Sequence, residues 1–129
     1  AAAEEKGITL CMELLNSRVN HPDYQCDRTQ WGVAMCKAVG SPSVKLLYDI
    51  YHMQIMEGDV TRTIDANFDV IGHYQLADNP GRHEPGTGEL NYDFLLPYLD
   101  EKGYGGWVGC EYAPAGDTVA GLGWAAKYL

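Results

Sequence analysis

The sequence predicts an α/β protein of four consecutive βα units with parallel strands. Short apolar runs alternate along the chain with segments of helical spacing, and glycine or proline separates them. The apolar runs lie roughly 25 to 40 residues apart, which leaves room for one helical crossover between successive parallel strands. A polar residue stands near the end of each run, where a buried strand would not normally place one.

The first predicted elements are a strand, a helix and a second strand. Residues 8–15 form an apolar run of a length typical of a buried strand. Residues 27–39 carry apolar side chains at helical spacing, and Gly40 and Pro42 follow where that helix would end. Residues 44–51 form the next apolar run and predict the second strand.

The rest of the chain continues this alternation. Asp59 and Asn91 each precede a segment of helical spacing, and both residue types accept hydrogen bonds from the free N–H groups of a helix start. A stretch rich in glycine and proline predicts a loop after the third strand. The predicted elements are helix 60–68, strand 70–77, loop 79–88, helix 92–102, strand 106–112 and a closing helix 118–129.

Two folds fit this order of elements. Parallel strands joined by right-handed helical crossovers build either a doubly wound open sheet or a closed barrel. A full barrel needs eight βα units and about 250 residues, whereas this chain has 129 residues and four predicted units. Periodicity alone leaves both folds open.

Composition limits the class of protein. A length of 129 residues fits a single domain, 1–129, and a hydrophobic content of 46% allows a packed core. The formal net charge of −9 disfavours nucleic-acid binding, because an acidic surface repels phosphates. No apolar run approaches the roughly 20 residues of a membrane span, so we expect no membrane partner.

The cysteines and the first residues carry further information. No two of the four cysteines are in CxxC spacing, and Cys11 and Cys110 lie inside apolar runs. This pattern is typical of reduced, buried thiols in a cytoplasmic protein. The opening residues AAAEEKG are typical of the last turn of a helix with a glycine cap. We therefore expect that a preceding segment is absent from this chain.

Four polar residues mark the ends of the four predicted strands: Glu13, Asp49, Gln75 and Glu111. Carboxylates are rarely buried without a partner, and the carboxyl ends of parallel strands form the edge where α/β proteins build their sites. Three carboxylates and one amide oxygen favour Mg²⁺ or Mn²⁺ over Zn²⁺ or Cu²⁺. The sequence therefore predicts a divalent metal site, with a purely structural polar network as the alternative.

Strand alternation predicts which residues share a face with these polar groups. The predicted groups are Cys11 with Glu13, Leu47 and Tyr51 with Asp49, and Gly109 with Glu111. Without a metal ion, carboxylates that converge in this way would repel one another, and some would hold protons.

Histidine and arginine residues near the strand ends allow two interpretations. His52 follows the second strand and is either a surface loop residue or a group that faces the substrate. His73 is interpreted as a structural histidine of the core, and His21 and His83 as exposed loop residues. Arg82 follows the third strand and is either solvated or, beside a site for an anionic substrate, a clamp for a carboxylate.

Four segments carry a long and specific pattern. They read YDIYHMQ at 48–54, IGHYQLADNP at 71–80, EPGTGELNY at 84–92 and GWVGCEY at 106–112. In order and spacing they resemble the hydroxypyruvate isomerase family of the xylose-isomerase-like TIM-barrel superfamily. The resemblance runs from about residue 7 to residue 112 and continues weakly to residue 129. Ketose 3-epimerases of this superfamily tend to carry histidine where this chain has Gln75, which favours the hydroxypyruvate type.

The resemblance implies a fold and a set of roles. The chain would be the C-terminal half of a (β/α)8 TIM barrel, with strands five to eight and without the first four. The four strand-end residues would hold a divalent metal ion. Glu13 and Glu111 would also be the acid/base pair, and His52 and Arg82 would contact the substrate.

The implied activity is a metal-dependent isomerisation of hydroxypyruvate to tartronate semialdehyde through an enediolate. The alternatives are a ketose 3-epimerase or 2-oxo-tetronate isomerase with the same chemistry, and a non-catalytic half-barrel module. The acidic charge balance and the few histidine ligands disfavour a zinc AP endonuclease. The expected partners are a small anionic hydroxy-keto acid or sugar and, at the two open sheet edges, the missing barrel half or a second copy of the chain.

Overall fold

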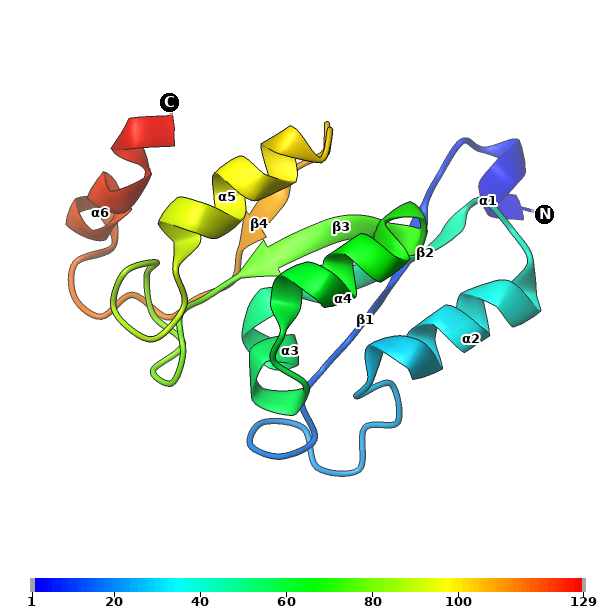
Figure 1. Ribbon diagram of the computed structural model, residues 1–129, viewed down its shortest axis with the longest axis horizontal. Coiled ribbons are helices and arrows are strands. Elements are labelled where there is room, and N and C mark those ends of the chain that lie inside the picture. The colour runs from blue at the N-terminus through cyan, green and yellow to red at the C-terminus, as the bar shows by residue number, and fades with distance from the viewer. Residues whose placement is uncertain (1, 129) are drawn as a thin grey trace.

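The chain forms one sheet of four parallel strands in the order β1-β2-β3-β4 (Figure 1). This arrangement comes from a computed structural model that describes residues 2–128. The strands are β1 (Leu10–Glu13), β2 (Val44–Asp49), β3 (Ile71–Leu76) and β4 (Val108–Cys110). Each strand pairs with its neighbour in parallel, so the predicted βα units are present and lie side by side in chain order.

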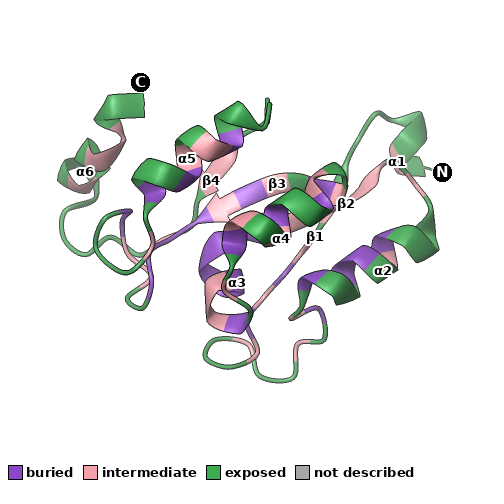
Figure 2. Ribbon diagram, in the orientation of Figure 1, coloured by how far each residue is buried: buried purple, intermediate pink, exposed green. Residues whose placement is uncertain are grey.

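Helices connect the strands and cover one face of the sheet (Figure 1). The helices are α1 (Ala2–Glu5), α2 (Thr29–Val39), α3 (Ile50–Met56), α4 (Val60–Asn67), α5 (Tyr92–Glu101) and α6 (Thr118–Gly121), with the 3₁₀ helices η1 (Phe68–Val70) and η2 (Leu122–Tyr128). Figure 2 shows buried residues alternating with exposed ones along α2, α4 and α5, as expected of helices with one covered face. No helix within residues 2–128 is long and apolar enough to cross a membrane.

The core lies between the helices and one face of the sheet. Leu46 and Tyr48 of β2 and Tyr74 of β3 are completely buried there. Gly32 allows α2 to approach β2 closely, because a Cβ atom at this position would lie 2.7 Å from Leu46 Cδ2. Alternate residues point to the other face of the sheet, where the side chains are only half-buried. These are Cys11, Lys45, Leu47, His73 and Gln75.

The outer strands are shorter and more exposed than the sequence predicts. The predicted strand 8–15 is reduced to β1, and Leu10 within it is 55% exposed. The predicted strand 106–112 is reduced to β4. Each of these strands has a neighbour on one side only in the described sheet, so ladder hydrogen bonds and packing extend over fewer residues.

A helix that the sequence analysis missed follows β2 directly. Residues 50 and 51 belong to α3 and not to the predicted strand 44–51, so Tyr51 does not share a strand face with Asp49. Asp49 ends the strand and caps the helix, because its Oδ1 accepts a hydrogen bond from the His52 N–H at 3.2 Å. The apolar residues continue across this junction, which hides the change from strand to helix in the sequence.

The predicted helix caps are not made by side chains. Asp59 precedes α4 with φ of 44°, and its carboxylate pairs with Arg62 at 2.8 Å instead of accepting from the helix backbone. Asn91 likewise makes no side-chain cap on α5. Asp117, which the sequence analysis did not single out, does cap α6 by accepting from the Ala120 N–H at 2.8 Å.

The two ends of the chain agree with the sequence analysis in part. A short helix does precede Gly7, which has the positive φ of 63° expected of a glycine cap. The predicted closing helix 118–129 is instead α6 followed by η2. Ala1 and Leu129, at the outer limits of these two predictions, lie outside the described residues.

All four cysteines are free thiols, but the buried pair differs from the predicted one. Cys26 and Cys36 are buried, Cys11 is half-buried and Cys110 is exposed. Cys110 ends the short outer strand β4, so its position in an apolar run of the sequence does not bury it.

Candidate active site

Three carboxylates and one histidine converge at the carboxyl ends of the strands. Glu13 ends β1, Asp49 ends β2, His52 lies in the first turn of α3, and Glu111 follows β4. Each of these residues has one potential ligand atom within 4.8 Å of those of the other three. The structure therefore brings together three of the four predicted metal positions and adds His52 to them.

Gln75, the fourth predicted metal position, lies on β3 in the middle of the sheet. It pairs in register with Asp49 on one side and with Gly109 on the other. A Cβ atom at Gly109 would lie 3.2 Å from Gln75 Cγ, so the glycine leaves room for the Gln75 side chain. The buried oxygens Asp49 Oδ2 and Gln75 Oε1 have no hydrogen-bond partner. An oxygen left in this state costs about 1–3 kcal/mol, so these two oxygens fit a cation bound at this edge.

Burial dominates the electrostatics of Asp49. Its side chain is completely buried, and loss of solvent raises the pKa of the carboxyl group to about 7. The hydrogen bond from the His52 backbone lowers this pKa, while the nearby carboxylates of Glu13 and Glu111 raise it. Asp49 thus exchanges a proton in a pH range where an ordinary aspartate is fully ionised.

The pKa of Glu13 is also raised. Its side chain is half-buried, and this burial is the main reason that its pKa is raised. The Glu111 carboxylate raises the pKa further, and the Arg82 guanidinium opposes both effects. A glutamate with a raised pKa is suited to take up and return a proton near neutral pH.

His52 is buried and neutral, so its interpretation as a surface loop residue is wrong. Its side chain is 0% exposed, and burial followed by the charges of Arg82 and His21 lowers its pKa to about 3. The ring packs edge-on against Tyr51 at 5.2 Å and His21 at 5.3 Å. Its Nδ1 faces the backbone N of Asn16 at 3.2 Å and the Asn16 side-chain Nδ2 at 2.6 Å.

Arg82 lies in the site and is not a freely solvated loop residue. Its Nη2 lies 2.6 Å from Glu111 Oε2 and 3.4 Å from His52 Nε2. Its guanidinium carbon lies 5.0 Å from the centre of the Tyr51 ring, a cation–π contact. Arg82 also has φ of 55°, a left-handed conformation that turns the loop after β3 back toward the strand ends.

Asp78 holds the loop that carries Arg82. The carboxylate is buried, and its two oxygens accept hydrogen bonds from four backbone N–H groups. These donors are Asn79 and Leu90 to Oδ1, and Gly86 and Gly88 to Oδ2. This one carboxylate therefore stabilises the loop together with the backbone hydrogen bonds within it.

The other histidines lie outside the cluster of ligand atoms. His73 is half-buried on the open face of the sheet, so it is not a residue of the core. His21 and His83 are also half-buried, not exposed as predicted. His21 packs against the His52 ring, and His83 Nδ1 lies 2.7 Å from the Ala113 carbonyl.

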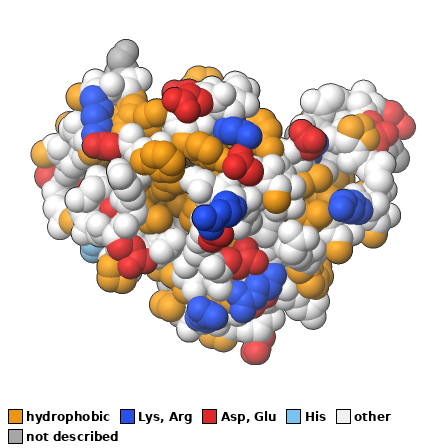
Figure 3. All heavy atoms as spheres, in the orientation of Figure 1, with side chains coloured by type: hydrophobic (Ala, Val, Ile, Leu, Met, Phe, Trp, Pro, Cys, Tyr) orange, Lys and Arg blue, Asp and Glu red, His pale blue; other side chains and the backbone are white. Residues whose placement is uncertain are grey.

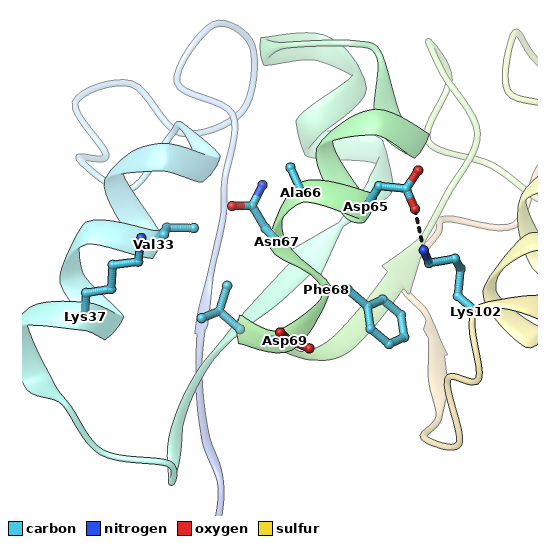
Figure 4. A pocket seen from close by; sticks show the side chains of 9 residues that line it. Val33, Lys37, Asp65, Ala66, Asn67, Phe68, Asp69 and Lys102 are labelled. Carbon is cyan, nitrogen blue, oxygen red and sulfur yellow. Dashed lines mark ion pairs between the residues drawn. The ribbon is translucent and has the colours of Figure 1, made fainter.

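A hollow of about 460 Å³ lies away from these residues (Figure 4). The C-terminal parts of α2 and α4 and the segment before β3 line it, so it lies at the end of the sheet where the strands begin. Lys102 pairs with Asp65 across this hollow at 2.8 Å. None of the six predicted metal, acid/base or substrate residues lines this hollow. They are Glu13, Asp49, His52, Gln75, Arg82 and Glu111.

The model of the xylose isomerase-like TIM barrel family matches residues 1–128. The chain belongs to this family. The barrel, and not the doubly wound open sheet, is therefore the fold of which the four βα units are part. Relatives in this family include a 2-oxo-tetronate isomerase of Cupriavidus necator, which is 47% identical over 99% of the chain and 49% of the relative.

Two further relatives are named hydroxypyruvate isomerase and not 2-oxo-tetronate isomerase. A hydroxypyruvate isomerase of Escherichia coli is 48% identical over 89% of the chain and 46% of the relative. A putative hydroxypyruvate isomerase of Homo sapiens is 45% identical over 91% of the chain and 43% of the relative. The chain thus spans about half the length of the curated relatives it matches.

Solved structures superpose on most of the chain. A Brucella melitensis protein described as "AP endonuclease, family 2" has a TM-score of 0.93 at 46% identity, over 97% of this chain and 48% of that one. A 3-keto-D-glucoside 4-epimerase of E. coli has a TM-score of 0.84 at 26% identity, over the same shares. A D-psicose 3-epimerase of Clostridium cellulolyticum has a TM-score of 0.74 at 30% identity, over 91% and 39%.

Proposed function

We propose that this chain is the C-terminal half of an isomerase that interconverts hydroxypyruvate and tartronate semialdehyde. The observation that carries the proposal is the convergence of Glu13, Asp49 and Glu111 at one edge of the sheet, with Arg82 beside them. Acidic groups that exchange protons next to a fixed guanidinium suit a small anionic substrate. Relatives named hydroxypyruvate isomerase match nearly the whole chain.

We infer that a divalent ion, Mg²⁺ or Mn²⁺, belongs at this edge. Glu13, Asp49, Gln75 and Glu111 would hold it through oxygen atoms, which such hard cations prefer. The two buried oxygens without hydrogen-bond partners, on Asp49 and Gln75, fit this role. When bound, the ion supplies Lewis-acid stabilisation of the charge that develops on the substrate oxygens.

The glutamates would move the proton. One would remove a proton from the hydroxymethyl carbon of hydroxypyruvate, and the other, or the same one, would return a proton to the adjacent carbon. The hydroxyl proton would pass from the oxygen of the first carbon to the former carbonyl oxygen of the second. The raised pKa of Glu13 supports this role, because its carboxyl group binds a proton more readily than an ordinary glutamate. Positioned acid–base groups contribute roughly 10²- to 10⁴-fold to a rate. Arg82 and His52 would bind the substrate carboxylate and hydroxyl groups.

A 2-oxo-tetronate isomerase is the second candidate, because the Cupriavidus necator relative matches 99% of the chain at 47% identity. That substrate is longer by one carbon and would undergo the same proton transfer. A ketose 3-epimerase and a non-catalytic half-barrel module are further alternatives. We do not propose DNA repair, since the net charge of −9 opposes DNA binding. The basic and acidic side chains on the helical face in Figure 3 are also interspersed, without a basic stripe among the residues drawn there.

Substrate profiling of the protein tests this proposal. Hydroxypyruvate, a 2-oxo-tetronate and a ketohexose are assayed with Mg²⁺ or Mn²⁺, and again after chelation. We expect the highest kcat/KM with hydroxypyruvate, loss of turnover on chelation and recovery when metal returns. A higher kcat/KM with the 2-oxo-tetronate would select the second candidate. Metal binding without turnover of any of the three would support the non-catalytic module.

We also propose that a second barrel half covers the open face and the outer strands. Leu10 and Met12 of β1 are 55% and 37% exposed, and Trp107 before β4 is 87% exposed. Apolar side chains along outer strands favour pairing with another segment, either the missing half or a second copy. The four free thiols agree with a reducing compartment such as the cytoplasm, where we expect the protein to act.

A further inference from the structure

Asn16 is a buried polar residue at the edge of the candidate site. It lies three residues after Glu13, and its side chain is 0% exposed. Its Oδ1 accepts hydrogen bonds from the backbone N–H groups of Val19 and Asn20, both at 2.9 Å. The Nδ2 end of the amide must therefore point the other way, toward Asn20 Oδ1 at 2.8 Å and His52 Nδ1 at 2.6 Å.

The backbone of Asn16 acts on the same nitrogen. Its N–H lies 3.2 Å from His52 Nδ1, and a backbone N–H can only donate. Two donors from one residue thus converge on Nδ1, which must accept and cannot carry a proton. A neutral imidazole has one N–H and one bare nitrogen, so the proton of His52 lies on Nε2.

We propose that Asn16 is a positioning residue that holds His52 as the Nε2–H tautomer, so that His52 offers the site a hydrogen-bond donor and not a metal ligand. A ligating histidine normally donates its second N–H to a carboxylate or carbonyl oxygen. Here the second nitrogen meets two donors, which is the opposite arrangement. His52 therefore stays outside the coordination sphere although it lies among the carboxylates.

The tautomer also defines what binds between His52 and Arg82. His52 Nε2 and Arg82 Nη2 lie 3.4 Å apart, and both are donors, so they cannot bond to each other. Asp49 Oδ2 is 3.9 Å from Nε2, too far for a hydrogen bond. An anionic oxygen would accept from both groups at once. Resting on the proposed function, we assign this position to a carboxylate or oxyanion of the substrate.

Nitrogen NMR of the ¹⁵N-labelled chain at neutral pH tests the tautomer directly. His→Gln variants at 21, 73 and 83 identify the ring signals of His52 by elimination. We expect a bare Nδ1, a protonated Nε2 and an N–N coupling across the hydrogen bond from Asn16 Nδ2 to His52 Nδ1. The proposal would be overturned by a protonated Nδ1. It would also be overturned if the signals of Asn16 Nδ2 and His52 Nδ1 were both resolved and showed no coupling.

A matched pair of variants tests whether Asn16 selects the tautomer. Asn16→Asp keeps the oxygen that accepts from Val19 and Asn20 but replaces the donor to His52 with an acceptor, so the proton should move to Nδ1 or the ring should become charged. Asn20→Asp adds the same charge four residues away and should leave the ring unchanged. An unchanged His52 in folded Asn16→Asp would reject the role of the Asn16 side chain and leave only its backbone N–H as the donor. If Asn16→Asp does not fold, the coupling in the wild-type chain decides.

Titration with Zn²⁺, a diamagnetic probe, separates this inference from the proposed function. Metal binding at the strand ends should shift the Gln75 side-chain amide signals while His52 keeps its proton on Nε2. Loss of the Nε2 proton with Zn²⁺ would show that His52 is a ligand and would overturn the inference. An unmoved Gln75 signal would count against the proposed metal site and leave the tautomer result standing.

Discussion

Arg82 Nη2 lies 2.6 Å from Glu111 Oε2, so the loop after β3 meets the end of β4 at the candidate site. The two side chains are 26% and 48% exposed, and an ion pair at such a position contributes little to stability. Its effect is to hold the guanidinium over Tyr51 and beside the cluster of carboxylates. A substrate carboxylate would therefore find an arginine that is already oriented.

Arg82→Ala should raise KM for hydroxypyruvate more than it lowers kcat. Loss of a charge-assisted hydrogen bond of roughly 1.5 to 3 kcal/mol corresponds to about a 10- to 100-fold increase in KM. Arg62→Ala is the control, because Arg62 forms an exposed ion pair with Asp59 on α4 and should leave both constants unchanged. Steady-state kinetics with an unchanged KM in Arg82→Ala would remove Arg82 from substrate binding.

In the complete enzyme, Glu13→Gln and Glu111→Gln should each abolish turnover and leave the fold intact. An amide can still offer an oxygen to a cation, but it cannot accept the proton from the substrate carbon. We expect kcat to fall by at least about 10²-fold in each variant, with unchanged circular dichroism. Glu101→Gln, on the exposed end of α5, is the matched control. Near-wild-type turnover in either site variant would reject its acid/base role.

Asp78→Asn should destabilise the protein and loosen the loop that holds Arg82 in the site. The carboxylate accepts from four backbone N–H groups, and an amide loses one accepting oxygen and presents a donor to two of them. We expect a loss of about 2 to 4 kcal/mol in the free energy of unfolding, measured by urea denaturation. Asp100→Asn, at an exposed position of α5, should change it little. Equal stability of the two variants would show that the loop does not depend on Asp78.

Ionisation of Asp49 should reduce the stability of the metal-free protein as the pH rises from about 4 to about 7, whereas His52, with its lowered pKa of about 3, acts in the opposite direction over this range. The pKa of Asp49 is about 7 in the folded state, compared with an ordinary value of 3.8 that applies to the unfolded chain. Between these two pH values, the Asp49 carboxyl group therefore binds more protons in the folded state. Stability contributed by a raised carboxyl pKa is present below the unfolded value and is lost as the pH rises through the folded value. The slope from one such group is at most about 1.4 kcal/mol per pH unit. The raised pKa of Glu13 adds to it in the same direction.

Urea unfolding in the presence of a chelator measures this slope. Relative to the wild type, the free energy of unfolding of Asp49→Asn should increase between pH 4 and 7, because the amide does not titrate and His52 still does. A difference in the free energy of unfolding between Asp49→Asn and the wild type that does not change over this range would contradict the raised pKa of Asp49.

The sequence was sufficient for the parts of the fold that depend on periodicity. The four parallel strands and the helices α2, α4 and α5 follow from apolar spacing and from glycine or proline at their ends. Helix α3 was not predicted, because Ile50, Tyr51 and Met53 continue the apolar run of β2 and only the Asp49 cap marks the change. The exposed ends of β1 and β4 could not be predicted either, since their burial depends on what lies beside the outer strands.

The candidate site was predictable where residue type and strand position agree. Glu13, Asp49 and Glu111 are carboxylates at strand ends, and the structure gathers them within 4.8 Å. Asn16 was missed, because its role depends on the orientation of one amide in a loop without periodicity. The signal available in the sequence was a polar residue shortly after a strand-end glutamate, which is too common to single out. Asp78 was missed for the same reason, although it determines the loop that carries Arg82.

The central claim is that Glu13, Asp49, Gln75 and Glu111 bind one divalent ion. Its most direct test is a crystal structure with Mn²⁺, in which anomalous scattering locates the metal. We predict one Mn²⁺ peak with an oxygen of each of these four side chains at about 2.0 to 2.6 Å, and with His52 Nε2 outside the coordination sphere. A peak at another place, or one coordinated by His52 and without Gln75, would contradict the account.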